Sequence, residues 1–310
     1  MPDSTERAVE HVLSTRLGGG WTVLPQGASA FCPTWRAQPA GRAASHDTLF
    51  LKSAPGAQAA VLQAEADGLA ALEAARCIRT PHVVGCWVDA PLDVVVLAME
   101  WLDLASHPVR DFGERFGRQL AALHLAAAAA GEGRFGWRCD NWLGATPQRN
   151  RWSAQAGLEG WLAFFATERL GAMAAMLSTQ GSAPELVVAV GRVVEALPEL
   201  FDDGHEPRPC LIHGDLWSGN WGCLRDGAPV IYDPAVSISD AEAELAMMEL
   251  FGGPPAGFWP AYRAAAPVSE GYVRRRKLYQ LHQLLNHALL FGGGYARQAL
   301  TVIDALLAGR

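Results

Sequence analysis

The sequence predicts an α+β protein with two domains, a small β-rich N-terminal domain and a larger, mainly helical C-terminal domain. Short runs of β-branched and aromatic residues, which are typical of strands, are concentrated before about residue 100. From about residue 110 onward, apolar residues recur with the helical period, interrupted by one β-type segment at residues 209–236. We therefore expect domains at residues 1–101 and 102–310, with the segment 209–236 in the second domain.

The N-terminal domain is expected to hold five short strands and one internal helix, after a first helix that Gly18 ends. The strand-like runs cover residues 21–24, 31–37, 48–52, 83–88 and 94–99. Residues 57–77 are rich in alanine and leucine and predict a helix between the third and fourth strands. Residues 100–103 then connect the two domains.

The C-terminal domain is expected to be built from amphipathic helices. Phe112, Phe116 and Leu120 fall on one helical face. Further helices are predicted over residues 158–177 and 184–197, and a long one over residues 272–291. The segment 209–236 is the only β-type run among them.

Charge and composition exclude several classes of protein. The chain of 310 residues has 25 Lys and Arg against 32 Asp and Glu, a net charge of −7 that argues against a general nucleic-acid binder. Half of the residues are hydrophobic, which excludes a disordered chain. The longest apolar run, residues 120–130, is interrupted by His124 and is too short to cross a membrane. The N-terminus has no signal-peptide pattern and the six cysteines have no metal-binding spacing, so we expect a cytoplasmic protein with reduced thiols.

The segment 209–236 contains the residues that indicate chemistry. Asp226-Gly227, between two apolar runs, predicts a two-residue hairpin turn. In that register Asn220 lies opposite Asp233 in a non-hydrogen-bonded pair, with Cα atoms about 4.5 Å apart. An amide oxygen and a carboxylate this close together are suited to Mg²⁺, with nucleotide phosphates and waters as its other ligands.

Asp215 lies five residues before Asn220, a spacing found in the catalytic loop of kinases. A carboxylate beside a Mg²⁺–phosphate centre can orient a substrate hydroxyl and accept its proton. The alternative is that Asp215 and Asn220 only cap turns. The joint pattern with a register-matched Asp233 favours the catalytic interpretation.

A buried ion pair is predicted in the N-terminal domain. Glu65 lies in the middle of the apolar stripe of the helix 57–77. The stripe consists of Val61, Leu62, Leu69 and Leu72. A carboxylate there is costly unless it is paired, and Lys52 at the end of a strand is the natural partner. The alternative is that both side chains bend out into solvent.

Four segments carry a more specific pattern: residues 213–220 (HGDLWSGN), 233–236 (DPAV), 243–246 (AELA) and 249–253 (ELFGG). Together they resemble the fructosamine kinase (ketosamine 3-kinase) family, whose fold is that of the protein kinases and aminoglycoside phosphotransferases. Residues 135–137 (FGW) and 140–148 (DNWLGATPQ) also match, so the resemblance covers nearly the whole chain from about residue 48. It implies a two-lobed, protein-kinase-like fold with a nucleotide-binding N-lobe.

The resemblance also implies an activity, the ATP-dependent phosphorylation of the O3 hydroxyl of a ketosamine. The substrates would include sugar adducts on protein lysines, and the reaction would serve deglycation repair. Asp215 would be the catalytic base, and Asn220 and Asp233 would hold Mg²⁺. Lys52 would bind the α and β phosphates of ATP, braced by Glu65.

Two further segments would contact the nucleotide by the same resemblance. Met99, Glu100 and Leu102 would line the adenine pocket, with main-chain groups of Glu100 and Leu102 as adenine partners. The phosphate-covering loop would be residues 27–32, in which Gly27 and Ser29 would present backbone N–H groups.

This loop departs from the family pattern, because it contains a single glycine and positive-φ conformations become costly elsewhere in it. The nucleotide affinity or the geometry of the loop is therefore expected to be atypical. Cys32 at the end of the loop would be redox-sensitive only if its thiolate were favoured, and an inert thiol is the expected state.

The acceptor is expected to be a small hydroxyl on a sugar-like group. Ser239 followed by Glu242 predicts a capping box that opens a helix at Asp240. The segment between Asp233 and that helix is short, whereas a protein kinase needs a long activation segment to hold a peptide. Several tryptophans could stack on the sugar or the adenine, although core packing is their more common role: Trp217, Trp142 and Trp101.

Two alternatives stay open. The same constellation of residues serves kinases of aminoglycosides, choline or homoserine, because the acceptor loops decide the substrate. The alternative from a different class is a catalytically inactive, kinase-like binding module. Its only support is that the phosphate-covering loop contains a single glycine. The sequence carries no signal for the oligomeric state.

Overall fold

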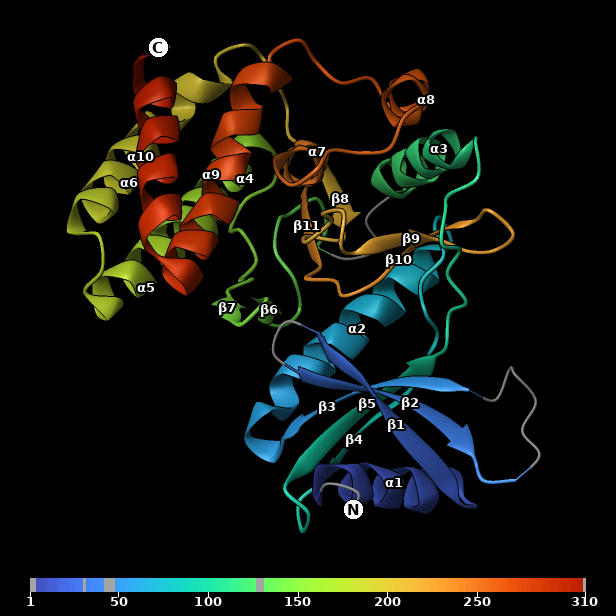
Figure 1. Ribbon diagram of the computed structural model, residues 1–310. Helices are drawn as coiled ribbons and strands as arrows, with labels where there is room; N and C mark the ends of the chain where they lie inside the picture. The colour runs from blue at the N-terminus through green and yellow to red at the C-terminus, as the bar shows by residue number, and fades with distance from the viewer. Residues whose placement is uncertain (1–3, 30–31, 42–47, 127–130, 309–310) are drawn as a thin grey trace. The chain divides into compact units, whose positions relative to one another are not determined.

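The computed structural model describes residues 4–29, 32–41, 48–126 and 131–308. The chain forms two compact units, Met1–Pro108 with Gly222–Asp233, and Val109–Trp221 with Pro234–Arg310. The first unit holds a five-stranded sheet and the second holds most of the helices (Figure 1). Within the described ranges, no helix combines the length and the apolar character that a membrane span requires.

The first unit is built on an antiparallel sheet with the strand order β1-β2-β3-β5-β4. Its strands are β1 (Trp21–Ser29), β2 (Cys32–Pro39), β3 (Leu49–Pro55), β4 (Val83–Asp89) and β5 (Val94–Glu100). All five predicted strands are present. β1 runs beyond its predicted end at residue 24, because a bulge between Pro25 and Gly27 allows the pairing with β2 to continue.

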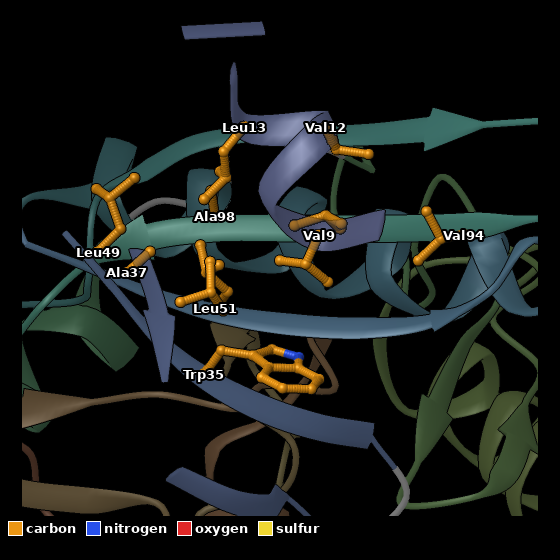
Figure 2. Close-up of a cluster of buried hydrophobic side chains, with 11 residues drawn as sticks. Val9, Val12, Leu13, Trp35, Ala37, Leu49, Leu51, Val94 and Ala98 are labelled. Carbon is orange, nitrogen blue, oxygen red and sulfur yellow. The ribbon is translucent and has the colours of Figure 1, made fainter. Parts of the chain in front are cut away.

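Helices α1 (Ser4–Leu17) and α2 (Ala59–Ala75) cover opposite faces of this sheet (Figure 1). Successive side chains of β5 point to opposite faces of the sheet and so pack with different helices. One set packs with Val9, Val12 and Leu13 of α1 (Figure 2): Val94, Val96 and Ala98. The other set packs with Leu62 and Leu69 of α2: Val95, Leu97 and Met99. Because β5 is buried on both faces, its sequence is a continuous apolar run instead of an alternating one.

The hairpin of β9 (Trp221–Cys223) and β10 (Pro229–Ile231) differs from the prediction. The Leu224 N–H donates to the Ala228 carbonyl over 2.9 Å, and the Gly227 N–H donates to the Leu224 carbonyl over 2.9 Å. The loop therefore has three residues, with Gly227 in the left-handed conformation at φ 84°. This is a type I turn followed by a G1 bulge.

The predicted two-residue turn is wrong, and the register of the hairpin is shifted by one residue. The pairing that would have set Asn220 directly opposite Asp233 therefore does not hold. The physical reason is that an Asp-Gly step suits both kinds of loop. A two-residue type I′ turn needs a positive φ at both residues, whereas the three-residue loop needs it only at Gly227, and Asp226 does not adopt it.

The second unit contains most of the helices and two short ladders. Its helices are α3 (Phe112–Leu125), α4 (Gly157–Phe164), η3 (Phe165–Gly171), α5 (Ala172–Gln180), α6 (Pro184–Ala196), η4 (Leu197–Phe201), α7 (Ala241–Leu250), α8 (Phe258–Ala265), α9 (Tyr272–Phe291) and α10 (Gly293–Ala308). The ladders are β6 (Asn141–Leu143) with β7 (Thr146–Gln148), and β8 (Pro209–Ile212) with β11 (Ser237–Asp240). The single helix predicted over residues 158–177 is interrupted, because η3 forms π-helical turns between α4 and α5.

The ladder of β8 and β11 leads into the segment with the candidate catalytic residues. Ile212 at the end of β8 pairs with Ser237 at the start of β11, and His213 follows directly. β11 then continues into α7, whose N-cap is Asp240, since its side chain accepts the Glu242 N–H over 3.2 Å. The predicted cap at Ser239 is therefore wrong by one residue, because the Ser239 hydroxyl bonds to the Ser237 hydroxyl and the Asp240 side chain accepts from the start of the helix.

Candidate active site

A cluster of three charged side chains around a buried lysine lies in the first unit. The Nζ atom of Lys52 in β3 is 2.8 Å from Oε1 of Glu65 in α2. The same Nζ is 2.8 Å from Oδ1 of Asp233, which follows β10. Lys52 is 4% exposed, so its side chain does not turn out into solvent. The predicted pairing of Lys52 with Glu65 is confirmed, and Asp233 joins it.

The electrostatics of this cluster keep the lysine charged. Burial alone would lower the pKa of Lys52, but the carboxylates of Glu65 and Asp233 raise it well above its usual value. Burial raises the pKa of Glu65 to about 6, although the neighbouring Lys52 lowers it. One cation and two carboxylates carry an excess of negative charge when all three are ionised, which favours a further cation nearby.

Asp233 has an unusual main-chain conformation. Its φ is 59°, in the left-handed region that a residue with a side chain rarely adopts. The strand before it is fixed, because the Ile231 N–H donates to the Arg79 carbonyl over 3.0 Å. A strained residue at the end of a fixed strand is common at functional sites.

Asp215 and Asn220 lie on one tight loop of the second unit. The amide nitrogen Nδ2 of Asn220 donates to the carbonyl oxygen of Asp215 over 2.7 Å and to Oδ2 of the same residue over 3.1 Å. The Trp217 N–H also donates to the Asp215 carbonyl over 3.1 Å. Because the amide nitrogen of Asn220 donates its hydrogens to Asp215, the amide oxygen Oδ1 is the atom of this side chain that is suited to bind a metal ion.

The main chain before Asp215 is held by Glu244 of α7, a residue that the sequence analysis did not single out. Its carboxylate accepts the N–H of His213 over 2.6 Å and the N–H of Gly214 over 2.8 Å. Burial would raise the pKa of Glu244, but contacts with His124 and His213 lower it below its usual value, so it is ionised. A sequence signal existed, since Glu244 is a carboxylate among buried apolar residues of a helix, as Glu65 is.

Gly214 is required by the geometry of this loop. Its φ is 85°, and a Cβ atom built on it would lie 2.1 Å from the carbonyl oxygen of Ala235. The Ala235 N–H donates to the His213 carbonyl over 2.8 Å, which keeps the two strands of chain in close contact. No side chain fits between them, so this position needs glycine.

The residues expected to line the adenine pocket lie at the end of β5. Met99 is buried against α2. The Glu100 N–H donates to the His82 carbonyl over 2.9 Å, and the Glu100 carboxylate pairs with Arg79. A main-chain contact from Glu100 to a nucleotide would therefore have to use its carbonyl oxygen. Leu102 is half-buried in the chain that follows β5.

The expected phosphate loop is only partly described. Gly27 follows the bulge in β1 and has a φ of 126°, which only glycine adopts readily. The main chain of Ser29 pairs with Cys32 across the hairpin, and Ala30 and Phe31 lie outside the described residues. Burial raises the pKa of the Cys32 thiol although Lys52 lowers it, so the thiol form is favoured, as expected of an inert cysteine.

The three tryptophans considered for stacking lie in different surroundings. Trp217 on the catalytic loop is 39% exposed, and its ring lies against Gly219. Trp142 is half-buried in β6. Trp101 packs with Phe50 at a centroid distance of 6.3 Å and lies under the Arg36 guanidinium at 5.0 Å. Trp217 is therefore the best placed of the three to meet a ligand beside Asp215.

Known proteins are similar to this chain in sequence and in fold. A probable ketoamine kinase of Synechocystis sp. is 42% identical over 259 residues, which are 83% of this chain and 82% of that protein. The chloroplastic protein-ribulosamine 3-kinase of Arabidopsis thaliana is 34% identical over 262 residues, 84% of this chain and 76% of that protein. The crystal structure of a putative fructosamine-3-kinase from Thermobifida fusca has a TM-score of 0.80 at 34% identity and covers 97% of this chain and 99% of that one.

The fold extends to more distant proteins. The choline kinase LicA from Streptococcus pneumoniae has a TM-score of 0.63 at 14% identity, over 98% of this chain and all of that chain. The predicted α+β, protein-kinase-like fold is therefore confirmed. The family model for fructosamine kinase matches residues 36–309, and this chain belongs to the fructosamine kinase family.

Proposed function

We propose that this protein is an ATP- and Mg²⁺-dependent kinase that phosphorylates the O3 hydroxyl of ketosamines, free or bound to protein lysines. The observation that carries the proposal is the buried Lys52, bonded to Glu65 and Asp233 as a phosphate-binding lysine must be held. The names of its relatives, ketoamine kinase and protein-ribulosamine 3-kinase, support this choice of acceptor.

In this proposal Lys52 contacts the α and β phosphates of ATP, and Glu65 fixes its position. The raised pKa of Lys52 supports the role, because a phosphate-binding lysine must stay protonated. Met99, Glu100 and Leu102 would contact the adenine, and Gly27 and Ser29 would cover the phosphates.

Asn220 and Asp233 would hold Mg²⁺, and their donor atoms fit that ion. Each offers a hard oxygen, the amide Oδ1 of Asn220 and the carboxylate of Asp233, and Mg²⁺ prefers such ligands together with phosphate oxygens and waters. When bound, the ion neutralises charge that develops on the phosphates.

Asp215 is proposed as the base of the reaction. Its carboxylate would accept the proton of the acceptor hydroxyl while that oxygen forms a bond to the γ-phosphorus and the bond to the β-phosphate oxygen breaks, which releases ADP. Asn220 and Glu244 assist by holding the loop around Asp215 in one conformation.

Two features support a small, sugar-like acceptor. The chain passes from Asp233 to the first residue of α7, Ala241, with only β11 and a few residues between them, which leaves no segment to hold a peptide strand. The exposed ring of Trp217 next to Asp215 offers an apolar face for the C–H groups of a sugar.

The deciding experiment is an ADP-release assay with fructosyl-lysine and ribulosyl-lysine as acceptors. We expect turnover with a ketosamine, and loss of turnover with retained ATP binding in Asp215→Asn. Turnover only with aminoglycosides, choline or homoserine would keep the kinase and remove the ketosamine assignment. If millimolar Mg-ATP produces no thermal stabilisation, the chain is instead an inactive binding module.

A further inference from the structure

A small polar cavity lies within the second unit, against the chain that leads to Asp215. It has a volume of about 30 Å³ and is bounded by α4, η3, α7, α9 and the ladder of β8 and β11. Its lining includes Gly214 and Ser237 from the chain near Asp215, together with Trp161 of α4 and three residues of α9: Tyr279, His282 and Gln283.

Three residues that line this cavity each carry a buried polar atom that makes no hydrogen bond to the described part of the chain: Nε1 of Trp161, Nε2 of His282 and Oε1 of Gln283. The three residues are 1%, 6% and 5% exposed. Trp161 packs edge-on to Tyr279 at a centroid distance of 5.9 Å. The Tyr279 hydroxyl donates to Asp240, and its oxygen lies near the Trp161 indole without accepting a hydrogen bond of ordinary geometry from Nε1. Unsatisfied polar atoms are costly in a protein interior, so three around one cavity indicate a bound polar molecule.

The chemistry of these atoms identifies the class of that molecule. The indole N–H only donates, and the amide oxygen only accepts. The imidazole of His282 is neutral, since burial and the nearby Arg169 guanidinium lower its pKa to about 3. A metal ion would face the indole N–H and the Arg169 guanidinium, and an anion would face the Gln283 oxygen. A molecule that both donates and accepts meets all of these groups.

We propose that this cavity binds an ordered water molecule that accepts from Trp161, donates to Gln283 and forms its third hydrogen bond with His282. A cavity of this volume has room for one or two waters, and two to four polar partners are typical of a buried water. The water links α4 and α9 in a cavity that Gly214 also lines. It is therefore a structural component next to the chain that leads to Asp215, and this role does not depend on which acceptor the enzyme uses.

A crystal structure of the full chain at high resolution, from crystals grown in sodium bromide, tests the site directly. We expect one density peak at hydrogen-bonding distance from Nε1 of Trp161 and Oε1 of Gln283, without anomalous signal from bromide. An empty cavity, a bromide peak, or side chains that bond directly to one another would overturn the proposal.

A double-mutant cycle provides the second test, because two groups that bond to the same water must be coupled. Trp161→Phe and Gln283→Met each remove one partner of the water, so the melting temperature of the double variant should fall by clearly less than the sum of the two single shifts. The control pair is Trp161→Phe with Gln280→Met. Gln280 lies on the same helix but bonds to the Ala246 carbonyl at 3.1 Å. Additive shifts for the Gln283 pair, or equal coupling in the control pair, would contradict the shared water.

Discussion

The ammonium group of Lys52 lies 2.8 Å from the carboxylate of Asp233 and 2.8 Å from that of Glu65, so one buried cation joins β3, α2 and the end of β10. The two carboxylates have different environments. Asp233 is 31% exposed at its side chain and can exchange partners with a ligand, whereas the side chain of Glu65 in α2 is only 12% exposed. We therefore expect Glu65 to stay bonded to Lys52 when a ligand binds, and Asp233 to be the carboxylate that contacts the ligand.

Glu65→Gln should impair the use of ATP more than it impairs the fold. The variant removes the charge that fixes Lys52, and a hydrogen bond to a charged group contributes about 1.5–3 kcal/mol, so kcat/KM for ATP should fall roughly 10- to 100-fold. Steady-state ADP release at varied ATP measures this. The matched control is Glu73→Gln on the same helix, whose carboxylate pairs with the exposed His82. A Glu65 variant with the kinetics of the control would contradict the assignment of this pair to nucleotide binding.

Glu244→Gln should lower both stability and turnover. Both carboxylate oxygens of Glu244 accept main-chain N–H groups, and an amide offers only one acceptor oxygen in their place. One buried N–H group is left unsatisfied, which costs about 1–3 kcal/mol of unfolding free energy. Urea denaturation measures that loss, and kcat at saturating substrates reports the displaced loop. Glu185→Gln, on the exposed side of α6, is the control and should change neither. Unchanged kcat in Glu244→Gln would remove it from the positioning of Asp215.

Gly214→Ala should be far more damaging than an ordinary glycine replacement. The new Cβ would lie 2.1 Å from the Ala235 carbonyl oxygen, which is a steric clash. Alanine would also have to adopt a φ of 85°, which is costly for a residue with a side chain. Gly181→Ala isolates the second effect, because Gly181 has a φ of 69° with nothing within 4 Å of its Cβ position. We expect a loss of about 1 kcal/mol in the control and of more than about 3 kcal/mol at Gly214, measured by urea denaturation. Equal losses would show that the chain near Ala235 can move aside.

His205 should make the stability of the second unit depend on pH. Its Nε2 is 2.8 Å from Oδ2 of Asp240, and its Nδ1 is 3.7 Å from Oε1 of Glu242. Burial alone would lower the pKa of His205, but the bond to Asp240 and the charge of Glu242 raise it, against a smaller opposing effect of Arg275. The folded state therefore binds the proton more tightly than the unfolded state does.

The sign of the effect follows from that raised pKa. The stabilisation is fully present below about pH 6.5, the ordinary pKa of histidine, and is lost as the pH rises through the higher pKa of the folded state. The melting temperature of His205→Gln should therefore fall below that of the parent at about pH 6, and the two should converge at about pH 9. His11→Gln, at an exposed position of α1, should track the parent throughout. A difference in melting temperature between His205→Gln and the parent that grows with rising pH would contradict this role of His205.

The sequence predicted the ion pair but not the hairpin register, and the two outcomes have different physical causes. Glu65 was identified because a carboxylate on the buried face of a helix needs a cation, and Lys52 was within reach. The hairpin depended on the choice between a two-residue and a three-residue loop. Those loops differ little in local energy, so contacts of the hairpin with other segments select between them, among them the bridges from Arg79 to Val230 and from Leu104 to Leu224.

Glu244 was missed for a related reason. A carboxylate beside Leu245 and Ala246 needs a partner as much as Glu65 does, but the partners of Glu244 are main-chain N–H groups. Main-chain partners leave no mark in a sequence, because every residue carries them. The π-helical turns of η3 and the bulge in β1 belong to the same class of feature, set by contacts between elements and not by local residue preference.

The two-sided burial of β5 separates the sheet into a chemical side and a structural side. Lys52 pairs with Leu97, which faces α2, so the lysine and the α2 layer share one face. None of the buried residues of the α1 layer is itself among the proposed nucleotide contacts. Random mutagenesis of this sheet should therefore yield two kinds of defective clone: those altered on the α1 face lose soluble yield but keep specific activity, whereas those altered on the α2 face lose activity per folded molecule.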